Sequence, residues 1–173
     1  MPTPISHAAV GFAIAAWTQP APPSTRVCVA AAACAALPDI DVLGWPLHLS
    51  DASPFAHRAI THSLAFALIG ALLTTAVFFR SEQKQQRARV ALVLWLALLS
   101  HGCLDALSSY SLGVGFFVPF SEQRYRFAWT PLGDSAGMLA RQLTKEALVV
   151  FLPAALLGWL GFRFRSRRLM PAP

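Results

Sequence analysis

The feature that most constrains this chain is a series of apolar runs, of which LAFALIGALLTTAVFF at 64–79 is the clearest. Over the full length, 55% of the residues are hydrophobic and only 13% are charged. A soluble domain carries about 25% charged residues. Because so few charges cannot cover a surface that faces water, we predict a small integral membrane protein of the all-α class.

The apolar runs predict a membrane-embedded bundle of about five helices. The last three runs approach the roughly 20 residues that a helix needs to cross a bilayer. The first two are shorter and are joined by the proline-rich turn QPAPPSTR, so they extend at their ends, tilt, or form a buried hairpin. Without an internal repeat, a single domain over 1–173 is expected. The runs are 8–17, 27–37, 64–79, 90 to about 107, and 148–164.

Lysine and arginine are concentrated beside the apolar runs and give a formal net charge of +6. This placement fits lipid headgroups and membrane topology, so we expect membrane lipids as partners and no nucleic acid. The densest clusters are RSEQKQQRAR at 80–89 and the basic tail at 163–173. The positive-inside rule puts both in the cytoplasm. The N-terminus then lies outside, as does the connection at 108–147, where basic residues are sparser.

This topology gathers histidines and aspartates from four segments at one membrane face, the outer one. The topology was drawn from lysine and arginine alone, so the convergence is an independent result. It predicts a polar site at the membrane surface. Its members are His7, Asp39, Asp41, His57, His62, His101 and Asp105.

The spacings of these residues suit a metal ion. His101 and Asp105 are four apart on a predicted helix, so both can reach one cation. Asp39 and Asp41 in PDID follow a proline at a helix end. There, an extended pair two residues apart can present both carboxylates to one side or divide them between two ions.

The two histidines of HRAITHS are five residues apart and would diverge by about 140° on a regular helix. We therefore expect His62 on the helix as a ligand and His57 on the preceding turn. Imidazole with carboxylate favours Zn²⁺, with Mn²⁺ or Fe²⁺ as alternatives. Because the residues exceed one tetrahedral shell, either two divalent ions or one ion with a general base accounts for them.

Each motif also has a simpler explanation. The pair of His101 and Asp105 can be an ordinary helix contact, and PDID a turn that caps a helix. HRAITHS can be an interfacial anchor in which Arg58 reaches the headgroups. His7 can be a solvated terminal residue, and we expect His48 to be a loop residue. Only their joint placement favours a site.

Several motifs together resemble the YdjM-like, LexA-regulated group of inner-membrane metal-dependent hydrolases. They are SH at 6–7, LPDID at 37–41, HRAITHS at 57–63 and LLSHGCLDALSSYSLGVGFFVPFSEQRYRFAW at 98–129. The resemblance implies a multi-pass protein of the bacterial inner membrane. It also implies a metal site formed by the seven residues named above. The segment with His101 and Asp105 is, more remotely, similar to one in zinc-dependent phospholipase C and P1-type nucleases.

The first hypothesis is a metal-dependent hydrolase of phosphoester or related lipid substrates that works at the periplasmic face. Asp39 or Asp41, or His57 beside them, would take the proton from an activated water. The guanidinium groups of Arg58, Arg124 and Arg126 suit phosphate because they offer a planar, bidentate fork. The alternative for the arginines is interfacial anchoring beside an aromatic belt.

Two other hypotheses involve no chemistry. An ion transporter would use membrane-embedded histidine and aspartate, but the polar residues stop at one face and no titratable ladder continues inward. A structural protein whose cation holds short helices together is the third reading, since metal binding contributes directly to folding.

Overall fold

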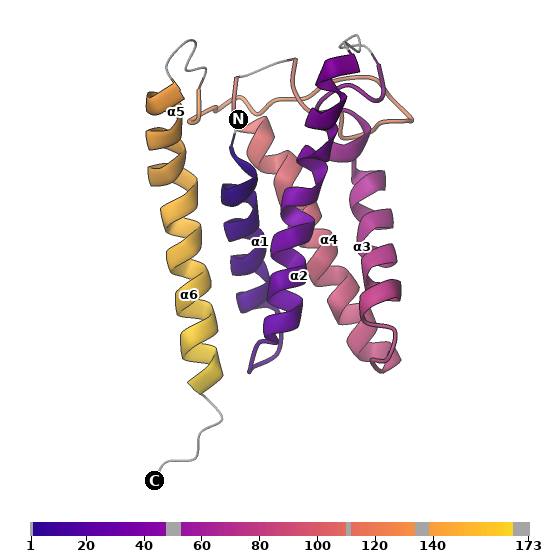
Figure 1. Ribbon diagram of the computed structural model, residues 1–173, viewed down its shortest axis with the longest axis vertical. Coiled ribbons are helices and arrows are strands. Elements are labelled where there is room, and N and C mark those ends of the chain that lie inside the picture. Colours follow the sequence, from indigo (N-terminus) through magenta and orange to yellow (C-terminus); the bar gives the residue numbers. More distant parts are fainter. Residues whose placement is uncertain (1, 48–52, 110–111, 134–138, 168–173) are drawn as a thin grey trace.

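The computed structural model describes residues 2–47, 53–109, 112–133 and 139–167. His48 and the end of the basic tail, 168–173, lie outside the described residues. The helices stand side by side and their long axes run roughly parallel (Figure 1). The helical elements are α1 Pro4–Thr18, α2 Thr25–Ala36, a 3-10 helix Leu37–Leu47, a 3-10 turn Ile60–His62, α3 Leu64–Phe78, α4 Lys84–Ala106, α5 Leu139–Glu146, a π-helical turn Ala147–Phe151 and α6 Leu152–Arg167.

The predicted helical membrane protein is confirmed. Three helices are long and apolar enough to cross a membrane, namely Thr25–Gly44, Lys84–Ala106 and Leu139–Arg167. The described residues contain no β-strand, only an isolated antiparallel bridge between Val114 and Tyr125. The long C-terminal helix is continuous because the π-helical turn joins α5 to α6.

The lengths of two helices differ from the expectation. The second apolar run is not short, because a 3-10 helix continues α2 and extends the span to 20 residues. The third run is shorter than a membrane span, since α3 has 15 residues. The extended conformation expected for PDID is also wrong, because Asp39 and Asp41 lie on this 3-10 helix. Residues two apart on a 3-10 helix diverge by about 120°, so Asp39 and Asp41 point in different directions.

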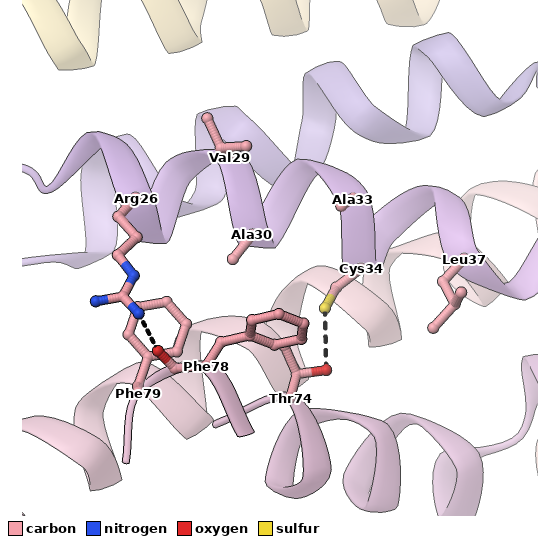
Figure 2. A pocket seen from close by; sticks show the side chains of 9 residues that line it. All are labelled: Arg26, Val29, Ala30, Ala33, Cys34, Leu37, Thr74, Phe78 and Phe79. Atoms are coloured by element: carbon pink, nitrogen blue, oxygen red, sulfur yellow. Dashed lines mark hydrogen bonds between the residues drawn. The ribbon is translucent and has the colours of Figure 1, made fainter. Parts of the chain in front are cut away.

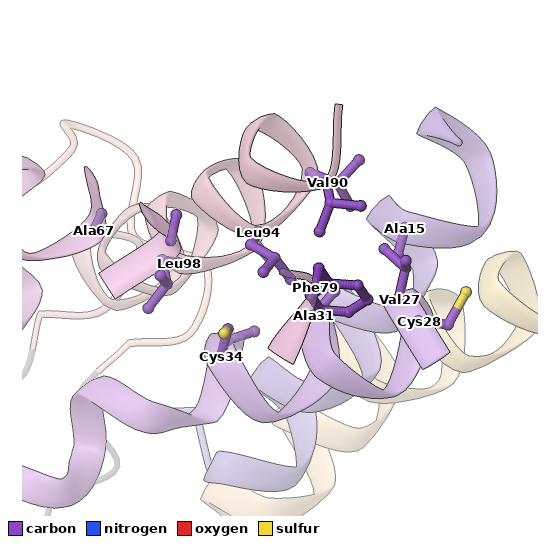
Figure 3. Close-up of a cluster of buried hydrophobic side chains, with 14 of the residues drawn as sticks. Ala15, Val27, Cys28, Ala31, Cys34, Ala67, Phe79, Val90, Leu94 and Leu98 are labelled. Atoms are coloured by element: carbon purple, nitrogen blue, oxygen red, sulfur yellow. The ribbon is translucent and has the colours of Figure 1, made fainter. Parts of the chain in front are cut away.

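Helix α1 lies at the centre of the packing and contacts α2, α4 and α6, whereas α3 packs on α4. The core between these helices is made largely of small and branched side chains (Figure 3). Ala15, Ala31 and Leu94 are completely buried there. Small side chains allow helix backbones to approach closely, as membrane helix interfaces require.

Helices α2 and α3 both pack on α4 and leave an apolar groove of about 390 Å³ between them (Figure 2). Arg26 lies at one end of this groove, where its guanidinium donates to the Phe78 carbonyl. Leu37 lies at the other end, where α2 passes into the 3-10 helix (Figure 2). The groove therefore follows α2 toward the PDID segment.

Gly11 sets the separation of α1 and α2. A Cβ atom at this position would lie 2.5 Å from the Ala31 carbonyl oxygen and 2.6 Å from the Ala35 Cβ. Neither atom can move without moving the backbone of α2. The absent side chain thus lets α1 approach α2, and the position of His7 one turn earlier on α1 depends on that approach.

We expect Gly11→Ala to lower the midpoint temperature of thermal unfolding in detergent, since overpacking costs about 1–3 kcal/mol. Gly70→Ala is the matched control, because a Cβ there would meet only the flexible Leu98 Cδ1, at 3.3 Å. The control should leave the midpoint unchanged or raise it slightly. Equal midpoints for the two variants would show that α1 and α2 are not closely packed at Gly11.

Candidate metal centre

The elements that carry the predicted metal ligands come together at the end of the bundle where the chain begins (Figure 1). His7 lies on the first turns of α1, and the two aspartates of PDID lie on the 3-10 helix after α2. HRAITHS forms the turn before α3, while His101 and Asp105 lie in the last turns of α4. Four segments distant in sequence thus meet at one point.

Four buried side chains form the inner group of this centre. Asp39, His62, His101 and Asp105 each offer one ligand atom, and these atoms all lie within 4.8 Å of one another. His62 Nε2 is 2.9 Å from His101 Nε2 and 3.3 Å from Asp105 Oδ2. Asp39 Oδ1 is 3.5 Å from His101 Nε2 and 4.0 Å from His62 Nε2. We call these four residues the inner quartet.

The separations fit a metal ion. Ligand atoms about 2.1 Å from a tetrahedral ion lie about 3.4 Å from one another. The four distances given above bracket that value. Two imidazoles and two carboxylates are also a donor set that divalent transition metals accept. The inner quartet can therefore bind one cation.

Asp39 gives the strongest indication of a cation. The residue is 7% exposed, and neither of its carboxylate oxygens has a hydrogen-bond partner among the described residues. An isolated buried carboxylate is costly, by several kcal/mol, unless a cation or a set of donors compensates it. Two imidazole nitrogens, of His101 and His62, lie 3.5 Å and 4.0 Å from its Oδ1. A cation between these groups removes the cost.

Hydrogen bonds orient both imidazoles of the inner quartet. His101 Nδ1 lies 2.7 Å from the Ala35 carbonyl oxygen, so this nitrogen is the donor and Nε2 presents its lone pair to the centre. His62 Nδ1 lies 3.3 Å from Asp41 Oδ2 and 2.9 Å from the Thr61 hydroxyl. Contacts of this kind fix the tautomer of a metal ligand and increase its basicity.

Asp41 belongs to a second group, with His57 and His62, whose atoms could also hold an ion. Unlike Asp39, Asp41 has polar partners within the protein for both of its carboxylate oxygens. Its Oδ1 pairs with His57 Nδ1 at 2.7 Å, and its Oδ2 accepts from Thr61 at 2.7 Å and from the Arg58 amide at 3.1 Å. These contacts satisfy Asp41 without a cation. They make it a support for His62 and a partner for His57.

Electrostatics around His62 favour positive charge. Burial lowers the pKa of His62, but its hydrogen bonds and charge interactions with Asp105 and Asp41 outweigh that effect, so the pKa is raised above its usual value. The same two carboxylates attract a cation. Metal ligation by Nε2 would replace positive charge on the ring by positive charge on the ion.

Arg58 is completely buried and lies behind Asp105. Its Nε is 2.9 Å from Asp105 Oδ2, and its Nη2 donates to Ser108 at 3.2 Å. Its backbone adopts φ 65°, a conformation that costs a non-glycine residue energy. The Asp41 carboxylate and the Gly115 amide hold that backbone in place. These contacts indicate that Arg58 positions Asp105. They favour this role rather than the predicted binding of substrate by Arg58.

His7 lies against the inner quartet. Its ring stacks on His101 with centroids 3.7 Å apart, and its Nε2 is 3.6 Å from Asp105 Oδ1. Both ring nitrogens are buried, and neither has a hydrogen-bond partner within the described part of the chain. His7 is not one of the residues whose ligand atoms lie within 4.8 Å of one another, so its assignment as a ligand stays a prediction.

The sequence did not indicate Glu146, which anchors the start of α1 beside His7. This buried carboxylate accepts from the Thr3 amide at 2.6 Å, and from the Thr3 and Ser6 hydroxyls at 2.5 Å. A carboxylate at a helix N-terminus is stabilised by the helix dipole. The one available signal was a glutamate just before the apolar run at 148–164.

The arginines of RYRF lie farther from the centre. Arg126 is exposed and donates to the Ser109 carbonyl at 3.3 Å. Arg124 lines a separate cavity of about 350 Å³ together with Pro54 and Glu122. Neither arginine belongs to the inner quartet or to the group of Asp41, His57 and His62. Their role in binding substrate stays a prediction.

The family described as YdjM inner membrane protein matches residues 1–169. The protein named Inner membrane protein YbcI of Escherichia coli (strain K12) is 34% identical over 177 residues, which cover 95% of this chain and 100% of that protein. No solved structure matches.

The two aspartates of PDID should differ in their effect on metal affinity. We expect Asp39→Ala to abolish high-affinity binding of Zn²⁺, because it removes a direct ligand. Asp41→Asn should keep one site but weaken it about 10- to 100-fold, as loss of a supporting hydrogen bond does. Isothermal titration of the metal-free protein in detergent measures both. Equal losses in the two variants would contradict the distinction between ligand and support.

Proposed function

The chain belongs to the YdjM inner membrane protein family, and on that premise we propose that it is a membrane-bound metal-dependent hydrolase. Its substrate would be a phosphoester or a related bond in a lipid or another membrane-proximal molecule. The observation that carries the proposal is the pair of buried Asp39 oxygens that lack hydrogen bonds and face two oriented imidazoles.

We propose one divalent ion in the inner quartet, with Zn²⁺ favoured and Mn²⁺ as the alternative. Zinc accepts imidazole nitrogens and carboxylate oxygens, and a hydrolytic zinc would take three of the four groups as ligands and keep its fourth position for water. When bound, a divalent ion would lower the pKa of a water molecule and polarise a phosphoryl oxygen. A second ion at Asp41, His57 and His62 is not needed, because hydrogen bonds already satisfy Asp41.

The pair of His57 and Asp41 supplies the acid–base group. Asp41 holds His57 through Nδ1 at 2.7 Å, and the His57 side chain is 10% exposed, whereas that of His62 is fully buried. A carboxylate that orients an imidazole makes it a competent proton acceptor. His57 lies next to the inner quartet, since its ring centroid is 5.5 Å from that of His62. It can therefore take a proton from water and return it to a leaving oxygen.

A lipid substrate fits the surroundings of the centre. The apolar groove between α2 and α3 ends at Leu37, two residues before Asp39. A chain of a membrane lipid in this groove would bring its polar end toward the inner quartet. Arg124 and Arg126 lie on the connection that follows α4 and offer guanidinium groups for phosphate.

A structural cation is the second candidate function, and the burial of the inner quartet favours it. All four side chains are at most 7% exposed, and they come from three separate segments that an ion would hold together. Structural metal sites are closed in this way, whereas catalytic sites keep a position open to substrate. The partly exposed ring of His57, held by Asp41, is the feature that favours catalysis.

We further propose that the centre faces the periplasm, because the basic segment at 80–89 lies at the opposite end of the bundle. In a chain with Cys28, Cys34 and Cys103 replaced by alanine, an impermeant maleimide should label Glu122→Cys in spheroplasts. Ser81→Cys should react only after lysis. The reverse pattern would place the centre in the cytoplasm.

His57→Ala separates catalysis from metal binding. When loaded with zinc, this variant should keep its metal, and its hydrolysis rate should fall about 10²- to 10⁴-fold below that of wild type. Phosphatidylglycerol in mixed micelles and bis(4-nitrophenyl) phosphate are suitable substrates, and Glu122→Gln is a control on a carboxylate outside the centre.

Asp39→Ala should lose both metal and hydrolysis. If zinc-loaded wild type hydrolyses neither substrate, and Asp39→Ala only lowers the unfolding temperature, the hydrolase proposal fails and the structural cation replaces it.

A further inference from the structure

A second pocket lies at the opposite end of the bundle from the metal centre. It has a volume of about 410 Å³ and is lined by the last turn of α1, the first half of α4 and the C-terminal part of α6. The segments that line it are distant in sequence, since Arg89 and Arg165 both belong to it. No residue of this pocket takes part in the centre described above.

The polar end of the pocket is cationic. Arg165 is held in place, because its Nη2 donates to the Gln19 carbonyl at 2.5 Å and its guanidinium lies 6.0 Å from the Trp17 ring centroid. Its Nε is buried and has no hydrogen-bond partner among the described residues. Arg89 is exposed, and the described residues that line the pocket include no acidic side chain. Two guanidinium groups therefore share one pocket whose described lining holds no carboxylate.

The other end of the pocket is apolar. From Arg89, the wall follows α4 through Leu92 and Val93 to Leu96. Seven residues of helix rise about 10 Å, so this wall runs from the membrane boundary into the hydrocarbon. A ligand that fills the pocket must therefore have an anionic group at the boundary and an apolar chain that points into the bilayer.

We propose that this pocket binds an anionic phospholipid, with its headgroup phosphate at Arg89 and Arg165 and part of one acyl chain along Leu92 and Leu96. Guanidinium groups recognise phosphate through bidentate hydrogen bonds. Basic pockets between membrane helices bind anionic headgroups in this manner. The site is independent of the proposed hydrolase and serves to hold α1, α4 and α6 together at this end of the bundle.

Native mass spectrometry of the full chain in detergent tests the proposal with two lipids of identical acyl chains, phosphatidylglycerol and phosphatidylcholine. Wild type should bind one phosphatidylglycerol about 10- to 30-fold more tightly than phosphatidylcholine, as expected for two arginines. The double variant Arg89→Gln with Arg165→Gln should lose that preference. Arg89→Gln alone should lose part of it, and this exposed side chain can change without disturbing the fold.

The control is Arg80→Gln with Arg163→Gln, which removes the same charge at the same end of the bundle but outside the pocket. It should keep the preference. An equal loss in the control would mean diffuse attraction of the basic face and would overturn the proposal. The proposal would also be overturned if wild type bound both lipids equally. Displacement of the lipid by millimolar inorganic phosphate would likewise overturn it and would identify a site for the free anion.

Discussion

A carboxylate buried without hydrogen-bond donors is the constraint on which this structure depends. Asp39 lies in a membrane bundle, faces two imidazoles, and has neither oxygen satisfied by the described residues. An isolated charge in such a place would be strongly destabilising. The surrounding segments make sense as the parts of a site for a cation, because each places a donor atom or holds one in position.

The fold supplies that arrangement through unusually close packing. Gly11 lets α1 approach α2, and Glu146 fastens the first turn of α1 so that His7 stacks on His101. The connection after α4 crosses HRAITHS, where the Gly115 amide donates to the Arg58 carbonyl at 2.8 Å. That contact supports the strained backbone of Arg58, whose guanidinium lies beside Asp105.

Much of this could be predicted from sequence. Apolar runs indicated the helices, and the positive-inside rule brought His62, His101 and Asp105 to one membrane face. The different roles of Asp39 and Asp41 could not be predicted, because they depend on a 3-10 helix that turns two neighbouring carboxylates apart. Nor could the burial of Arg58, since an arginine beside a membrane is more often at its surface. Tertiary contacts, not local pattern, decide both.

The central claim is that the inner quartet binds a metal ion, and elemental analysis of purified, detergent-solubilised protein tests it most directly. Wild type should contain one zinc or manganese ion per chain, and His62→Ala and Asp105→Ala should each lose it while remaining folded enough to purify. Metal-free wild type that cannot be reconstituted with either ion would contradict the account and leave these residues as a buried polar network at the membrane surface.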